Sequence, residues 1–114
     1  KMALALNVFK TVTKVVPTNP VGIYTAPVGY TGVVLLAQCA NVGSTTEKVS
    51  FSHERTVAGV AVTTEILKDF AIESSDTANL LVGKLVLESN DVLVISATNG
   101  TDIKFLGSIL ETLK

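Results

Sequence analysis

The longest strand-forming stretch in this chain of 114 residues is YTGVVLLAQCANV, residues 30–42. Its centre, Val33–Ala37, is an unbroken apolar run, which is typical of a central strand covered on both faces. We therefore expect Val33 and Leu35 to be buried. Because side chains alternate along a strand, Leu35, Ala37 and Cys39 are expected to share one face.

Shorter stretches with a two-residue period flank this strand. In Glu47–Ser52, Val49 and Phe51 face one way, and polar side chains alternate with them. Thr63–Ile72 also permits a helical spacing, but its threonines and the all-β surroundings favour a strand. Between them, Glu54–Ala61 is expected to be a loop or an irregular edge. The other expected strands are Asn7–Lys14, Val21–Thr25, Leu80–Glu88, Asp91–Thr98 and Asp102–Glu111.

Proline and glycine residues separate these strands. Pro17 and Pro20 exclude a helix after the first strand. Asn99-Gly100 is a strong hairpin signal, because type I′ turns require positive φ at both central positions, so we expect the last two strands to pair through it. The pattern predicts an all-β fold: an antiparallel β-sandwich, jelly-roll-like, with about eight short strands. Val94 and Ile109 are expected in its core.

The length corresponds to one domain. We predict an N-terminal arm or edge strand over residues 1–20 and a sandwich domain over residues 21–114. Part of the N-terminal segment is expected to pair with a sheet edge of a neighbouring subunit.

The composition favours association with other protein chains. Apolar residues make up 47% of the chain, charged residues 17%, and the net charge is −1. Because charged residues usually reach about 25%, we expect other subunits to cover part of the surface. No basic patch is evident, so no nucleic-acid partner is expected. No segment approaches the roughly 18 apolar residues of a membrane span, and we find no targeting signal, so no membrane partner is expected.

Residue types that carry catalysis or bind metals are scarce. His53 is the single histidine and Cys39 the single cysteine, too few for an ordinary zinc site or nucleophilic centre. We expect His53 to lie at a strand end with its ring at the sheet margin, and Cys39 to be a buried, inert thiol. The prediction is therefore no enzyme activity, no catalytic residue, no cofactor and no metal. An enzyme centred on His53 is the alternative.

Two pairs of carboxylates could in principle hold a hard cation, Glu73 with Asp76 and Glu88 with Asp91. Carboxylates on turns are usually only solvated, so we expect no calcium ion at either pair.

Two tyrosines flank one turn. Tyr24 and Tyr30 could form a small platform for a glycan or another contact. The alternative is that both rings pack beside the turn.

Several stretches together resemble small virion structural proteins of tailed bacteriophages. Residues 23–35, IYTAPVGYTGVVL, are similar to a family opening of the form IYTAPaGkTavVl, and Ala40-Asn41-Val42-Gly43 to its ANvg loop. Phe51-Ser52-His53 resembles the versions of contractile-tailed cyanobacterial phages. Glu73–Asp76 departs from the family, which often has a proline-containing turn there. The likeness continues in the same order through Leu67–Ile72, Gly83–Glu88 and Leu106–Glu111.

This resemblance implies a non-enzymatic structural component of a bacteriophage particle and assigns no catalytic residues. It implies location in the virion, assembly in the host cytoplasm, and contacts with copies of itself and other virion structural proteins. We expect a capsid decoration (cement) protein. A neck, tail or baseplate protein, or a carbohydrate-binding adhesion module using Tyr24 or Tyr30, is the alternative.

Overall fold

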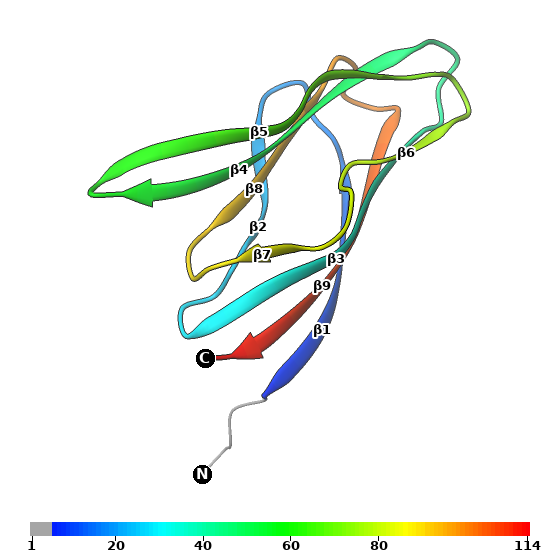
Figure 1. The fold of residues 1–114 in the computed structure, drawn as a ribbon. Coiled ribbons are helices and arrows are strands. Elements are labelled where there is room, and N and C mark those ends of the chain that lie inside the picture. The colour runs from blue at the N-terminus through cyan, green and yellow to red at the C-terminus, as the bar shows by residue number, and fades with distance from the viewer. Residues whose placement is uncertain (1–5) are drawn as a thin grey trace.

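The computed structural model describes residues 6–114 and shows an all-β chain (Figure 1). No helix occurs among these residues. Residues 1–5 of the predicted N-terminal arm lie outside the described part of the chain. The strands are β1 (Asn7–Val15), β2 (Val21–Thr25), β3 (Tyr30–Asn41), β4 (Glu47–Val57), β5 (Val60–Ile72), β6 (Thr77–Asn79), β7 (Leu85–Leu87), β8 (Val92–Ala97) and β9 (Ile103–Leu113).

These strands form two antiparallel sheets. The first sheet has the order β1-β9-β3-β6, with β7 also paired to β3, and the second has the order β2-β8-β4-β5. The chain crosses between the sheets at every connection except β4 to β5 and β6 to β7. With β6 and β7 as two parts of one interrupted strand, this is an eight-stranded, double-sheet jelly roll. The predicted antiparallel β-sandwich is confirmed.

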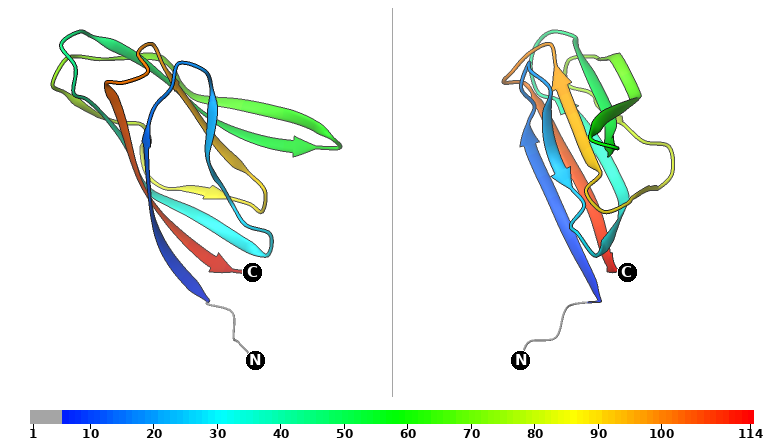
Figure 2. Two further views of the ribbon diagram at one scale, coloured as in Figure 1. Left: turned by 180° about the vertical axis from the view of Figure 1, so that it is seen from behind. Right: turned by 90° about the vertical axis from the view of Figure 1, so that its left-hand side faces the viewer.

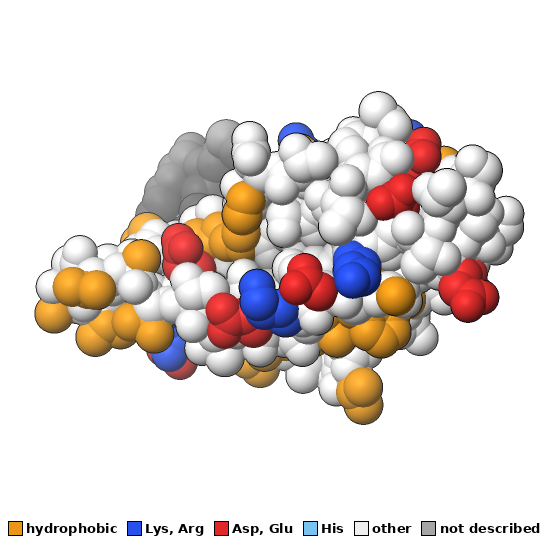
Figure 3. All heavy atoms as spheres, turned by 90° about the horizontal axis from the view of Figure 1, so that it is seen from above, with side chains coloured by type: hydrophobic (Ala, Val, Ile, Leu, Met, Phe, Trp, Pro, Cys, Tyr) orange, Lys and Arg blue, Asp and Glu red, His pale blue; other side chains and the backbone are white. Residues whose placement is uncertain are grey.

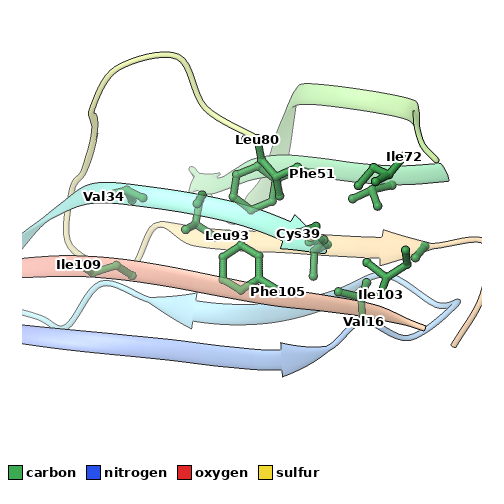
Figure 4. Close-up of a cluster of buried hydrophobic side chains, with 14 of the residues drawn as sticks. Val16, Val34, Cys39, Phe51, Ile72, Leu80, Leu93, Ile103, Phe105 and Ile109 are labelled. Carbon is green, nitrogen blue, oxygen red and sulfur yellow. The ribbon is translucent and has the colours of Figure 1, made fainter. Parts of the chain in front are cut away.

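The hydrophobic core lies between the sheets, where the side chains labelled in Figure 4 converge. Phe51 of β4 and Phe105 of β9 meet there with ring centroids 5.9 Å apart. From Ile103 to Glu111, every second residue of β9 is buried, because successive strand side chains point to opposite faces. The predicted burial of Val49, Phe51 and Ile109 is confirmed, whereas Val33 and Val94 are only half-buried.

A β-bulge changes which residues of β3 face the core. The register between β3 and β9 shifts by one residue between Val34 and Leu36. Because the extra residue shifts the two-residue alternation, Val34 and Ala37 are both buried, while Leu35 and Leu36 are exposed. The predicted burial of Leu35, its shared face with Ala37 and Cys39, and the coverage of this strand on both faces are therefore wrong.

Asn99-Gly100 joins strands of different sheets, so the predicted pairing of the last two strands is wrong. β8 pairs with β2 and β4, whereas β9 pairs with β1 and β3. The Asn99 side chain builds the connection, since its Oδ1 accepts hydrogen bonds from the backbone N–H groups of Thr101 and Asp102 at 2.8 and 3.1 Å. Neither Asn99 nor Gly100 has positive φ, so this is an Asx-type turn and not a type I′ hairpin.

The hairpin of β4 and β5 projects beyond the rest of the sandwich (Figures 1 and 2). β8 pairs with β4 only as far as Glu54, so residues 55–62 form a two-stranded segment with no third strand paired to it among the described residues. We call residues 55–62 the ribbon. The predicted loop over Glu54–Ala61 is wrong, because only Ala58 and Gly59 turn, both with positive φ. The ribbon contributes to a radius of gyration of 14.8 Å, above the roughly 13 Å expected at this length.

The edges of the first sheet are uneven. Of the strand predicted over Leu80–Glu88, only Leu85–Leu87 is strand, as β7, so the rest of that prediction is wrong. β6, which ends just before the predicted range, and β7 pair with β3 on either side of a loop. At the opposite edge, β1 pairs with β9 of the same chain over nine consecutive residues. Pairing of β1 with a neighbouring subunit stays a prediction.

Candidate functional site

An apolar row crosses the outer face of the first sheet. Phe9 of β1 lies opposite Leu110 of β9, Leu110 opposite Val33 of β3, and Val33 opposite Val86 of β7. Directly opposed side chains in antiparallel strands lie about 5 Å apart, so these four form one continuous strip, which we call the outer row. Phe9 is 75% exposed and Val86 55% exposed. Nothing in the described chain covers the ends of the strip.

The surface farther along the same strands is concave. A shallow hollow of about 570 Å³ lies there, lined by Thr13, Val15, Gln38 and Leu106 among others, with Lys14 and Lys104 also in its lining. Lys104 is the single charged residue at the outward-facing positions of β1, β9 and β3.

The outer face of the second sheet is polar instead. Val49 and Phe51 point into the core, so Ser50 and Ser52 point outward on the same strand. They line a hollow of about 430 Å³ together with Glu54, Glu65 and other residues. The two outer faces of the sandwich thus differ in chemistry, and only the first has the apolar strip that a docked protein would cover.

The ribbon carries a second exposed apolar patch. Residues 56–64 contain no charged side chain and are all exposed, and Val57 and Val60 are 54% and 64% exposed. Figure 3 shows hydrophobic side chains gathered at this projecting end, at the left of the view. Because an isolated two-stranded hairpin is at best marginally stable in water, such a patch is typical of a segment that gains a partner.

At the base of the ribbon, a buried carboxylate binds an arginine. The side chain of Asp91 is 2% exposed, and the Arg55 guanidinium donates to both its oxygens, Nε to Oδ1 at 2.8 Å and Nη2 to Oδ2 at 2.6 Å. The backbone N–H of Glu88 donates to Oδ2 at 2.9 Å, and the His53 ring nitrogen Nε2 lies 3.0 Å from it. Hydrogen bonds from Arg55, with smaller contributions from His53 and Glu88, hold the pKa of Asp91 well below its ordinary value.

His53 lies within β4 and faces Asp91, so its predicted place at a strand end is wrong. His53 pairs with Asp91 and, within residues 6–114, makes no hydrogen bond to a serine or to Cys39. Asp91 is occupied by its donors, which disfavours the cation site considered for Glu88 and Asp91. No group of three or more metal-ligating side chains comes together among the described residues.

The two tyrosines of the predicted platform have different surroundings. Tyr24 is half-buried, and its hydroxyl donates to the buried Glu111 carboxylate of the opposite sheet at 2.6 Å. A Cβ on Gly32 would lie 3.3 Å from this hydroxyl, so the glycine leaves room for the ring. Burial and the bond to Glu111 raise the pKa of Tyr24. Tyr30 is half-buried at the start of β3, and a joint ligand platform stays a prediction.

Cys39 is fully buried, and burial raises the pKa of its thiol to about 12. A thiol protonated over the physiological range is a poor nucleophile. Among the described residues, no helix has the length and apolar character needed to cross a bilayer.

Sequence reasoning missed both the outer row and the Arg55–Asp91 pair. The outer row combines residues from four strands, and only the register brings them together. Arg55 and Asp91 are 36 residues apart in the chain, and Arg55 falls in a segment expected to be a loop. One signal of the outer row was present in the sequence. Phe9 is apolar, whereas its neighbours on the same face of the strand, Asn7 and Thr11, are polar.

Comparisons with known proteins support the fold. The sequence matches no protein-family model and no curated protein. The structure is similar to a chain of the T13 IBDV viral particle, with 9% identity and a TM-score of 0.58, covering 96% of this chain and 31% of that chain. It is also similar to a chain of the acid-stable capsid of Helicobacter pylori bacteriophage KHP30, with 16% identity and a TM-score of 0.55, covering 96% and 89%.

A third similar structure is a subunit of the disulfide-linked pili that form Bacillus endospore appendages, with 14% identity, a TM-score of 0.50 and coverage of 100% and 98%. This chain therefore spans about a third of the IBDV chain and most of the other two. At these identities the likeness shows the fold alone, a jelly-roll β-sandwich.

Proposed function

We propose that this chain is a non-enzymatic structural component of a bacteriophage particle, acting as a capsid decoration protein. The observation that carries the proposal is the outer row, an apolar strip across four strands on one face of a small sandwich, with its two ends exposed. Burying apolar surface contributes roughly 25 cal/mol per Å². A capsid supplies many identical sites where such a face is covered.

Three further observations support this role. The solved structures of similar fold include a phage capsid chain in which the matched region makes up 89% of the chain. The sequence resembles virion structural proteins of tailed phages, most closely those of contractile-tailed cyanobacterial phages. The two outer faces of the sandwich differ in chemistry, so the molecule has one face suited to the capsid and one suited to solvent. In this proposal the apolar face lies on the capsid and the polar face points toward solvent. Assembly would follow synthesis in the host cytoplasm.

A position in the neck, tail or baseplate is the second candidate, because the same apolar face would suit any repeated subunit. A glycan-binding adhesion module has less support. The Tyr24 hydroxyl is engaged with Glu111 across the two sheets, so it is a structural contact. Loss of glycan binding in Tyr30→Ala, with the fold retained, would favour the adhesion role.

The experiment compares two valines in the same segment. Val86 lies in the outer row, and Val82 is fully exposed in the loop before it. Val86→Asp places a charge on the proposed interface and is expected to reduce incorporation into particles at least tenfold, whereas Val82→Asp leaves it unchanged. Incorporation is measured by mass spectrometry of purified particles, and a density map locates the chain. Equal incorporation of both variants, or a map in which the first sheet faces solvent, contradicts the proposal.

A further inference from the structure

Strand β1 is a long, regular and free sheet edge. It is the first strand of its sheet and pairs with β9 from Asn7 to Val15 without a register shift. Its other side makes no strand pairing among the described residues. Natural edge strands are usually shortened, bulged or covered, because unpaired N–H and C=O groups attract other strands. The nine straight residues of β1 contain no proline and no bulge.

Strand β5 is the free edge of the second sheet, and its two halves differ. The register between β5 and β4 shifts twice, between Leu67 and Phe70 and again at Ile66. Asp69 in the same half has positive φ. These irregularities prevent continuous pairing along that half. From Val60 to Glu65 the register is unbroken, so only this distal part offers a straight edge for a new strand.

The two edges carry opposite charges. β1 contains Lys10 and Lys14 and no acidic residue, and Lys10 also lies 3.5 Å from Glu111. The straight part of β5, Val60–Glu65, contains Glu65 as its single charged residue, and Glu54 lies on the neighbouring strand. Lysines on an edge strand oppose unselective pairing and favour an acidic partner.

We propose that β1 of one copy pairs with the Val60–Glu65 edge of β5 on a second copy, which adds a strand across the interface. Main-chain hydrogen bonds would join the two copies, and the lysine–glutamate match would select this partner over a second β1. The contact is heterologous, so repetition generates a ring or a filament. It supplies the third strand that the ribbon lacks. The inference deepens the proposed structural role and rests on it.

Cysteine trapping tests the pairing directly. Thr11 and Thr13 of β1, and Thr63 and Thr64 of β5, are all exposed, and the native Cys39 is buried and unreactive. Four variants, each with one added cysteine at one of these positions, are purified with two different tags, mixed in pairs at high concentration and oxidised. A β1 variant mixed with a β5 variant should give a disulfide-linked heterodimer. Predominant β1–β1 dimers, or no β1–β5 product in any of the four pairings, overturn the inference.

Charge reversal provides an independent test. Lys14→Glu and Glu65→Lys are each expected to raise the dissociation constant for self-association about tenfold in sedimentation velocity, and the double variant should restore it. Lys84→Glu, in the loop before β7, is the matched control and should have no effect. A double variant that associates no better than the single variants contradicts the pairing. If Val86→Asp still reduces particle incorporation at least tenfold in that case, the proposed function stands and only this inference fails.

Discussion

Asp91 is a buried carboxylate at the point where the ribbon leaves the sandwich. Asp91 lies in the segment just before β8, and Arg55 lies on the inward face of β4. The Arg55 guanidinium binds both oxygens of Asp91. Removing one partner of a buried pair leaves the other charge without compensation, so each residue depends on the other. The pair therefore links the base of the projecting hairpin to the core of the fold.

Replacing Asp91 by Asn should lower the free energy of unfolding by about 1–3 kcal/mol, because the guanidinium loses its anionic partner. Denaturant unfolding at neutral pH measures this. Glu88→Gln is the matched control: Glu88 contacts the same guanidinium at 3.3 Å, but its side chain is 64% exposed. Exposed ion pairs contribute about 0–1 kcal/mol, so the control should lose little. Equal losses in both variants would contradict the importance of the buried site.

The same pair gives a pH dependence of known sign. Because the folded pKa of Asp91 is lowered, its stabilisation is fully present above the unfolded value of about 4 and is lost as the pH falls toward the folded pKa. The stability difference between wild type and Asp91→Asn should be constant from about pH 5 to 7 and shrink below about pH 4. Denaturation midpoints measured across this range check it. A difference that grows on acidification is the opposite result.

At the scale of the element, β1 is attached to its sheet mainly by backbone hydrogen bonds to β9 and contributes little to the hydrophobic core. Within it only Val8 and Val12 are half-buried, and the remaining side chains are exposed. The residues that fill the core come from other strands, so the sandwich should survive the loss of β1 while any contact made through it should not.

Deleting residues 2–14 is therefore expected to leave a β-rich circular dichroism spectrum and cooperative unfolding, while incorporation into particles falls at least tenfold. A deletion of Lys114 alone, at the other end of the chain, serves as control. Loss of the folded spectrum would show that β1 is an integral strand of the monomer.

At the scale of the molecule, two groups of exposed apolar side chains stand out among those spread over the described surface. Phe9 and Val86 lie at the ends of the outer row, and Val57, Val60 and Val62 lie on the ribbon. Large exposed patches on small soluble domains usually mark interfaces.

We therefore expect the purified protein to self-associate with increasing concentration, through contacts of more than roughly 1,000 Å² in total. Multi-angle light scattering over a wide concentration range measures the mass. High salt should weaken association if the edges pair through charges, because exposed charges are screened over about 10 Å at 0.1 M. A strictly monomeric protein at high concentration, with only small wet contacts in the particle map, favours the adhesion module.

The sequence by itself determined the class of fold and most of the strands. Alternation in residues 47–52 and 102–111 is a local property, since each strand must present one apolar face to a core. Burial of Val49, Phe51 and Ile109 followed from it. The scarcity of charge predicts association, and this stays a prediction.

Only the tertiary structure decided which strands are neighbours and which apolar residues stay outside. A positive-φ turn was expected at Asn99-Gly100 but occurs at Ala58-Gly59, because β8 and β9 belong to different sheets. The bulge at Leu35 moved an apolar side chain from the core to the surface. Register and sheet assignment depend on contacts between segments distant in sequence, so no local pattern could specify the outer row or the Arg55–Asp91 pair.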